Sequence, residues 1–284
     1  MPETASRFVA ACVQMRSGRD PARNRDDAVA GIREAASRGA QYVQTPEMTS
    51  LVERDRASLM EKVRTAEEDE TLAALREVAR ETGTLVHVGS LAVRAGGKVA
   101  NRAFLIDPDG ALIAAYDKLH LYDVDLPNGE RWRESATYEG GSCAIVAQTA
   151  LAPIGIAICY DIRFPALYRA LAEAGASVLT APAAFTKQTG EAHWHVLQRA
   201  RAIETGSFMI SAAQGGRHED GRDTYGHSLI VDPWGRVLAD AGNAEPGVIL
   251  AEIDLSLVDD ARARIPALKH ARPFRVETVP RPAA

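Results

Sequence analysis

Three side chains that could do chemistry stand where apolar segments of the sequence stop. Cys159 closes the run IGIAIC, Glu47 closes QYVQTPE, and Lys118 follows FLIDPDGALIAAYD. A thiol can act as a nucleophile when a base accepts its proton and a positive group stabilises the charge that develops on the substrate oxygen. Because α/β sheets place their sites at strand ends, these three residues are candidates for one site of nucleophilic catalysis.

Each of the three residues also has an ordinary structural explanation. A free cysteine is among the most buried residue types and is usually inert, and a lone Glu or Lys is usually a solvated surface charge. Pro165, which follows the polar stretch after Cys159, is typical of the first residue of a helix. The sequence therefore predicts a strand–turn–helix elbow at Cys159, beside a helix N-terminus that favours the thiolate.

Other kinds of reactive site lack their motifs. The sequence contains no HExxH, CxxC or acidic calcium loop, and no GxGxxG, GxxxxGK[ST] or GxSxG motif. His193 and His195 are two residues apart on a predicted helix, where they point in different directions and make a poor chelating pair. We therefore expect no metal and no organic cofactor. No histidine has a spacing that singles it out as the base.

Composition and charge exclude several classes of protein. The chain has 284 residues, of which 46% are hydrophobic and 25% charged, as in soluble globular proteins. The net charge of −5 includes no basic block, so we expect no nucleic-acid partner. No run of apolar residues is long enough for a membrane span, and the first residues lack the pattern of a signal peptide. Three cysteines cannot all pair, which favours a reducing cytoplasm.

Strands and helices alternate along the chain, which predicts a layered α/β fold with helices covering sheets that are apolar on both faces. A short apolar run favours a strand, whereas apolar residues three and four apart favour a helix. The predicted strands are 7–15, 41–47, 84–93, 153–159, 177–185 and 207–214, and the predicted helices are 20–40, 69–82, 165–175 and 190–206.

Two hairpins with the pattern D-P-x-G, at 104–117 and 228–241, divide the chain into two similar halves. Proline second and glycine fourth suit a type I turn that leads into a bulge. Each hairpin follows a strand–helix–strand stretch, and no Ser/Gly-rich linker separates the halves. We expect one domain over 1–265, followed by a proline- and arginine-rich extended tail over 266–284 that packs on a partner subunit or stays mobile.

The candidate residues and their surroundings resemble the nitrilase, or carbon–nitrogen hydrolase, superfamily. Glu47 in TPE, Lys118 in DKLHLYDVDLP and Cys159 in GIAICYDIRFP resemble its catalytic triad. The segment RWRESATYEGG places Glu134 where the family carries a supporting glutamate. The resemblance runs from AACVQM to VILAEIDL. It implies a four-layer α-β-β-α sandwich with two pseudo-symmetric halves, which forms a homodimer or higher homo-oligomer and commonly dimerises through its outer helices and C-terminal tail.

Within the superfamily the chain resembles the Nit amidases, and GRHEDGRDTYGHS is closer to the deaminated-glutathione amidases than to the ω-amidases. The resemblance implies hydrolysis of a non-peptide C–N bond in a carboxylate-bearing α-keto acid amide, here deaminated glutathione. An ω-amidase acting on α-ketoglutaramate and a non-catalytic scaffold remain alternatives. Glu191 and His195 depart from the family pattern TGPAHWE, which leaves the substrate open.

The same resemblance implies a role for each residue of the triad and its support. Glu47 would act as the base for Cys159. Lys118 would lower the pKa of the thiol and stabilise the oxyanion together with the amide N–H of Tyr160. Glu134 would hold Lys118 and Glu47 in position.

Three further residues are candidates for substrate binding. Arg163 would grip a substrate carboxylate or, alternatively, pair with Asp161 at the start of a helix. His193 and Trp194 would line the pocket, although an amphipathic helix facing the core explains Trp194 equally well.

Overall fold

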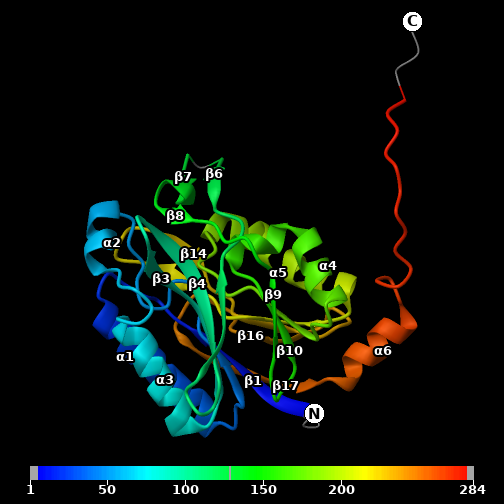
Figure 1. Ribbon diagram of the computed structural model, residues 1–284, viewed down its shortest axis with the longest axis horizontal. Coiled ribbons are helices and arrows are strands. Elements are labelled where there is room, and N and C mark those ends of the chain that lie inside the picture. The colour runs from blue at the N-terminus through cyan, green and yellow to red at the C-terminus, as the bar shows by residue number, and fades with distance from the viewer. Residues whose placement is uncertain (1–5, 128, 280–284) are drawn as a thin grey trace, which may run out of the picture.

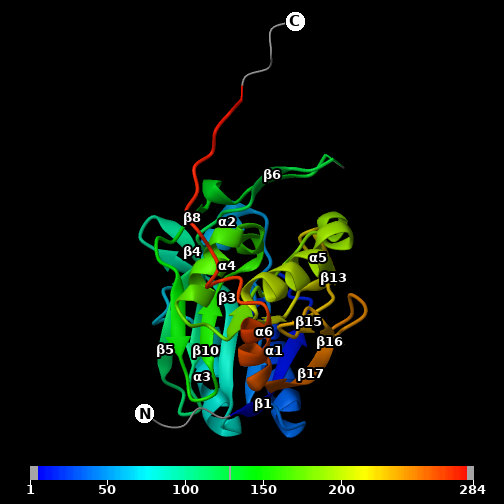
Figure 2. The same cartoon turned by 90° about the vertical axis from the view of Figure 1, so that its right-hand side faces the viewer.

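The computed structural model describes residues 6–127 and 129–279 and contains two β-sheets that face each other between two helical layers (Figures 1 and 2). Helices α1 (Pro21–Ser37) and α3 (Glu70–Thr82) contact one sheet. Helices α4 (Pro165–Glu173) and α5 (Lys187–Thr205) contact the other. The predicted α-β-β-α sandwich is confirmed.

The two sheets are built on the same plan. The first contains β1 (Arg7–Gln14), β2 (Tyr42–Gln44), β3 (Leu85–Ala95), β4 (Lys98–Ile106), β5 (Leu112–Asp117), β8 (Tyr138–Glu139) and β17 (Gly247–Asp254). The second contains β9 (Ile145–Gln148), β10 (Pro153–Ile156), β11 (Val178–Thr180), β12 (Phe208–Ser211), β15 (Leu229–Val231) and β16 (Val237–Asp240). The strand orders are β17-β1-β2-β3-β4-β5, with β8 beside β4, and β9-β10-β11-β12-β15-β16. In both sheets, the strands in the second, third and fourth places of this order run parallel to one another, and the other neighbours in the order pair antiparallel. The shared arrangement confirms the two similar halves.

The two D-P-x-G turns occupy equivalent places, between β4 and β5 and between β15 and β16. Gly110 and Gly235 adopt positive φ angles of 80° and 82°. Their amides donate to the carbonyls of Asp107 (2.8 Å) and Asp232 (2.9 Å), which closes each turn. A register shift accompanies each hairpin, so the predicted turn and bulge are both confirmed.

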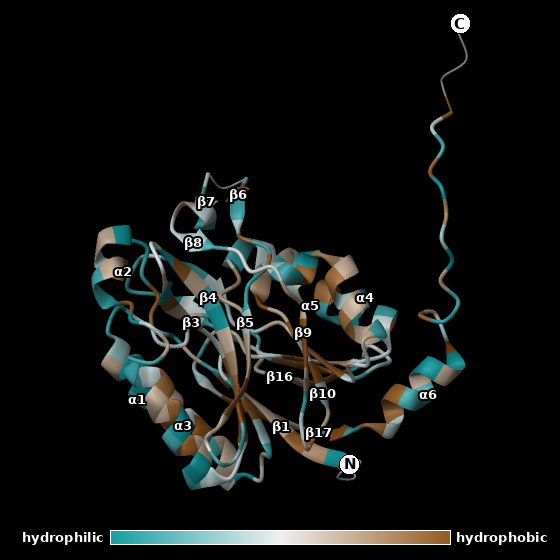
Figure 3. Cartoon of the chain, in the orientation of Figure 1, coloured by the Kyte–Doolittle hydropathy of each residue, from teal (hydrophilic) through white to brown (hydrophobic). Residues whose placement is uncertain are grey.

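Alternation along β1 shows how the sequence divides the core between the layers. Ala10 and Cys12 face the second sheet, whereas Ala11 and Val13 face the cluster under α1 and α3. Successive side chains of a strand point to opposite faces, so a strand that is apolar at every position must be covered on both sides. Figure 3 shows this distribution, with hydrophobic strands inside and mixed helices outside.

Four predicted strands end three or more residues earlier than expected, and three of these differences change where the candidate residues lie. β2 ends at Gln44 rather than at 47, β10 at Ile156 rather than at 159, and β11 at Thr180 rather than at 185, while β12 ends at Ser211 rather than at 214. Proline follows two of these strands, at Pro46 and Pro182, and cannot donate to a ladder. The candidate side chains therefore lie on loops just past the strands.

Several short elements were not predicted because they are too brief or too polar to show a clear period. They are helices α2 (Arg56–Lys62) and α6 (Ser256–Arg264), the hairpins β6 (Asp123–Asp125)–β7 (Arg131–Arg133) and β13 (Gly215–Arg217)–β14 (Asp223–Tyr225), and the 3₁₀ turns η1 (Glu134–Ala136) and η2 (Cys159–Arg163).

Within the described residues, no helix combines the length and the apolar character needed to cross a bilayer. Residues 266–279 contain neither helix nor strand and extend away from α6 (Figure 1). The last part of the predicted tail, 280–284, lies outside the described residues.

Candidate active site

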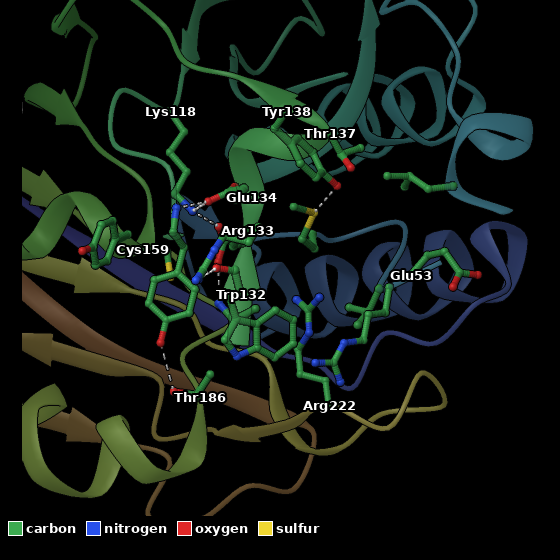
Figure 4. Close-up of a pocket in the computed structure, with 18 of the residues that line it drawn as sticks. Glu53, Lys118, Trp132, Arg133, Glu134, Thr137, Tyr138, Cys159, Thr186 and Arg222 are labelled. Carbon is green, nitrogen blue, oxygen red and sulfur yellow. Dashed lines mark hydrogen bonds and ion pairs between the residues drawn. The ribbon is translucent and has the colours of Figure 1, made fainter. Parts of the chain in front are cut away.

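A cavity of about 200 Å³ lies past the ends of strands from both sheets, and Glu47, Lys118, Glu134 and Cys159 all line it. Figure 4 shows Lys118, Glu134 and Cys159 in this cavity. Glu47 follows β2, Lys118 follows β5, and Cys159 follows β10. The fold therefore brings together four residues that are far apart in the sequence. All four were singled out as candidates from the sequence.

Lys118 is the centre of a buried charge network. Its Nζ lies 2.9 Å from Glu47 Oε1, and 3.1 and 2.9 Å from the two carboxylate oxygens of Glu134. Only 2% of Lys118 and 4% of Glu47 are exposed, so neither is the solvated surface charge that its residue type suggests. Among the described residues, Glu134 makes no direct hydrogen bond to Glu47, although such a bond was expected. It acts through Lys118 and through Asn101, whose Nδ2 donates to both acids at 2.9 and 3.0 Å.

The network fixes the charges of its members. Burial raises the pKa of Glu47, but the charge and hydrogen bond of Lys118 outweigh burial and leave that pKa below 4.5. Burial likewise opposes the charge of Lys118, yet Glu134 and Glu47 bring its pKa well above 10.5. At neutral pH the site therefore holds an ionised Glu47 beside a protonated Lys118.

Cys159 sits on a backbone elbow, as predicted. Its φ of 48° is a left-handed conformation that non-glycine residues rarely adopt. Its amide donates to the Pro182 carbonyl at 3.0 Å. Burial, followed by the charge of Glu47, raises the pKa of the thiol well above 9.0, although Lys118 lowers it. The expectation of a stabilised thiolate is wrong, because burial outweighs the single cation.

Asp161 holds the turn that carries Cys159. Its fully buried carboxylate accepts from the Ile158 amide at 2.9 Å and from the Tyr116 hydroxyl at 2.7 Å. The His120 amide donates to its other oxygen at 3.1 Å. These bonds join the elbow to the first sheet and explain how a strained residue stays in one place.

Of the residues predicted to bind substrate, Tyr160 lines the cavity, whereas Arg163, His193 and Trp194 are absent from the described lining. Arg163 stacks on Phe185 at 5.1 Å, and its Nη1 lies 3.2 Å from Nδ1 of His193. The predicted pairing of Arg163 with Asp161 is also not observed among the described residues. Trp194 is fully buried and belongs to the core, which was the alternative explanation.

The two departures from the family pattern, Glu191 and His195, also lie outside the described lining. His195 Nε2 lies 2.9 Å from Asp240, whose other oxygen lies 2.9 Å from Nδ1 of His227. His195, His227 and Asp240 place three possible metal-ligand atoms within 4.8 Å of one another. None of these three residues lines the cavity, so this cluster is separate from the triad.

Sequence reasoning missed three groups that complete the site. They are Asn101, the Ala184 amide, which donates to Glu47 Oε2 at 2.8 Å, and the Tyr122 amide, which donates to Glu134 Oε2 at 2.6 Å. Asn101 could have been identified from the sequence, because it interrupts the apolar strand KVANRAFLI. A buried carboxamide needs hydrogen-bond partners. Residue types do not show which backbone amides donate hydrogen bonds to the site.

Comparison with known proteins agrees with this geometry. The carbon-nitrogen hydrolase family model matches residues 9–263. Human deaminated glutathione amidase is 40% identical over 94% of this chain and 82% of its own length. The C. elegans NitFhit protein superposes with a TM-score of 0.89 at 35% identity, over 95% of this chain and 66% of that longer chain.

A third similar protein has a reactive cysteine in its active site. The amidase from Nesterenkonia sp. AN1 has a TM-score of 0.76 and 27% identity, over 91% of this chain and 98% of that chain. A mutant of that protein shows the result of Michael addition of acrylamide at its active-site cysteine. The family model, the human relative and the shared fold together show that this chain belongs to the carbon–nitrogen hydrolase family.

Proposed function

We propose that this chain is an amidase that hydrolyses deaminated glutathione, with Cys159 as its nucleophile. The observation that carries the proposal is the thiol, carboxylate and ammonium of Cys159, Glu47 and Lys118 gathered in one buried cavity. The activity named for the human relative and the reactive cysteine of the Nesterenkonia amidase support it. Cys12 is buried in the core and Cys143 is exposed, and neither is among the cavity's described lining residues.

In the first half of the reaction, the sulfur of Cys159 attacks the amide carbonyl while Glu47 takes the thiol proton. Because the thiol is neutral at rest, a nearby ionised base is required, and the lowered pKa of Glu47 keeps it ionised. The Lys118 ammonium and the Tyr160 amide stabilise the oxyanion. Collapse of this intermediate expels the amine, which receives the proton from Glu47, and leaves a thioester.

In the second half, Glu47 accepts a proton from water as that water attacks the thioester carbonyl. The intermediate breaks the C–S bond, releases a carboxylic acid, and returns the proton to sulfur. Glu134, Asn101 and the Ala184 amide act as positioning groups, because their hydrogen bonds hold Lys118 and Glu47 in place.

The substrate assignment is tested by a panel of α-keto acid amides. We expect kcat/KM for deaminated glutathione to exceed that for α-ketoglutaramate, with α-ketoglutarate and a dipeptide as products. A higher value for α-ketoglutaramate would replace the assignment with an ω-amidase. No hydrolysis of any member of the panel would favour a non-catalytic scaffold.

Asn101→Ala removes both hydrogen bonds that join Glu47 to Glu134. Two buried acceptors then lose a donor, so we expect a loss of about 1–3 kcal/mol in the free energy of unfolding. Looser positioning of Lys118 and Glu47 is expected to lower kcat/KM by about 10- to 100-fold. Thermal unfolding and steady-state kinetics measure the two effects.

Asn24→Ala is the matched control. Asn24 is equally buried, and its carboxamide bonds the backbone of Gly18 and Ser50, away from the cavity. This control is expected to lose stability while keeping its activity. Equal kinetic losses in the two variants would mean that Asn101 matters only for folding.

The pKa shifts predict a broad pH profile. The pKa of Glu47 lies below 4.5 and that of Lys118 well above 10.5, so the active charge state persists across the neutral range. We expect kcat/KM to stay level near neutrality and to fall on the acid side only as Glu47 becomes protonated, below pH 4.5. A fall between about pH 6 and 7, with the fold intact by circular dichroism, would instead indicate a histidine base.

We also propose that residues 1–265 form one domain and that the chain is a cytoplasmic homodimer. Exposed apolar side chains on α5 and beyond α6 support dimerisation, namely Val196, Ile203, Ile265 and Phe274. The tail over 266–279 would pack on the second copy. Light scattering is expected to give twice the chain mass of 30.5 kDa, and a monomer would contradict the proposal.

A further inference from the structure

Three side chains that the mechanism does not use form a cluster in the wall of the cavity. The guanidinium carbons of Arg54 and Arg222 lie 4.5 and 4.6 Å from the ring centroid of Trp132. The three residues line the cavity and come from the segment before α2, from β7 and from the β13–β14 loop. Figure 4 shows Trp132 beside Arg222. We call them the arginine–tryptophan cluster.

In the described part of the chain, the two positive charges of this cluster have one carboxylate partner, that of Asp220. Among the described residues, Arg54 is exposed and has no ion pair. Arg222 forms an ion pair with the buried Asp220, whose Oδ2 lies 3.7 Å from its Nη2, too far for a hydrogen bond, and the buried Nε of Arg222 has no hydrogen-bond partner among the described residues. Glu53 also lines the cavity, but its carboxylate already forms ion pairs with Arg19 and Lys62 at 2.7 and 3.1 Å. The cluster thus has unused donors that suit an anion.

Aromatic contacts place the cluster relative to the nucleophile. Tyr160, next to Cys159, contacts Tyr122 with ring centroids 5.0 Å apart, and Tyr122 contacts Trp132 at 6.4 Å. All of these aromatic residues line the same cavity as Cys159, so one wall of the cavity runs from the nucleophile to Trp132.

We infer that the arginine–tryptophan cluster binds a terminal carboxylate on the amine half of the substrate. Guanidinium groups bind carboxylates through two parallel hydrogen bonds, and stacking on an aromatic ring holds them in orientation. The substrate class is then α-keto acid amides whose leaving amine ends in a carboxylate. Deaminated glutathione has this group, whereas α-ketoglutaramate, which releases ammonia, does not. The inference rests on the proposed function for the place of the scissile bond.

The test measures binding separately from turnover. In a Cys159→Ala background, calorimetry compares deaminated glutathione with its C-terminal carboxamide, which lacks only the terminal charge. We expect the carboxamide to bind about 10- to 100-fold more weakly, from the usual strength of a charged hydrogen bond. Arg54→Gln and Arg222→Gln are each expected to weaken binding of the acid by a similar factor and binding of the carboxamide by less than about threefold.

Arg217→Gln is the matched control, because Arg217 is exposed in the same β13–β14 hairpin and is absent from the described lining. It is expected to bind both ligands like the parent. Equal binding of acid and carboxamide by the parent, or equal losses for both in the arginine variants, overturns the inference. So does failure to bind either ligand.

Turnover by the chain with Cys159 intact reports on the proposed function independently. Hydrolysis of deaminated glutathione without discrimination between acid and carboxamide would retain the function and reject the inference. Selective, arginine-dependent binding without hydrolysis would reject the function and retain the carboxylate site. Because Arg54 is exposed, its variant should fold even if the half-buried Arg222 proves necessary for stability.

Discussion

Cys159→Ala is expected to lower kcat/KM for deaminated glutathione by about 10⁴-fold or more, the scale on which loss of a nucleophile acts. Neither of the other cysteines is among the described residues that line the cavity, so no second thiol takes over. The alanine variant keeps Glu47 and Lys118, and their ion pair at 2.9 Å does not involve sulfur. We therefore expect the variant to remain folded and to bind substrate.

Cys143→Ala is the control for loss of a thiol, because Cys143 is exposed and lies outside the described lining. Its kcat/KM should stay within about threefold of the parent, as for most surface substitutions. Thermal unfolding of both variants separates a chemical effect from a folding defect. Substantial turnover by a folded Cys159→Ala variant would remove the nucleophile from the mechanism.

Glu47→Gln has the second largest expected effect. It keeps the size of the side chain but removes the base, which is expected to lower kcat/KM by about 10³-fold. Oε1 accepts from Lys118 and Asn101, and Oε2 accepts from the Ala184 amide. A carboxamide cannot accept on both sides, so one of these bonds is also lost. The charge of Glu47 raises the pKa of the Cys159 thiol, so its removal favours the thiolate, and alkylation of Cys159 by iodoacetamide should not slow in the variant although turnover does.

Glu81→Gln provides the comparison, since Glu81 pairs with Arg33 at 2.7 Å on the surface. Its steady-state rates and its alkylation rate are expected to match the parent. If Glu47→Gln retained its steady-state rates, the base would have to be another group, and the buried ion pair would be purely structural.

Glu47, Lys118 and Cys159 could be singled out as candidates because each follows an apolar segment typical of a buried strand. Their grouping as a triad came from the resemblance to the carbon–nitrogen hydrolase family, since residue type and position alone also fitted a buried thiol and solvated charges. The second half repeats the strand order of the first, and the matching D-P-x-G turns revealed this repeat. The fold class was therefore readable without coordinates.

Groups whose role depends on packing between segments were not predictable. Asn101 reaches Glu47 and Glu134 only because the fold brings β4 close to residues that are 54 and 33 positions away in the sequence. Trp194 was ambiguous because periodicity shows that a helix has a buried face but not what that face covers. Arg163 was misjudged for a similar reason, since its distance from Cys159 in sequence says nothing about the direction of its side chain.

The protonation state of Cys159 was also not predictable from the sequence. From sequence, a helix start and a lysine both favour the thiolate. In the fold the thiol is only 7% exposed and faces Glu47, and burial with that negative charge raises its pKa instead. This reversal gives Glu47 its proposed role, because a neutral thiol needs a base at the moment of attack.

The central claim is a covalent thioester on Cys159, and mass spectrometry of the acid-quenched enzyme during turnover of deaminated glutathione tests it most directly. We predict a mass increase equal to the α-ketoglutaryl group on the peptide that contains Cys159, which disappears when the substrate is exhausted. Turnover without an adduct in samples quenched during the first reaction cycle, or an adduct on Cys12 or Cys143, would contradict the account.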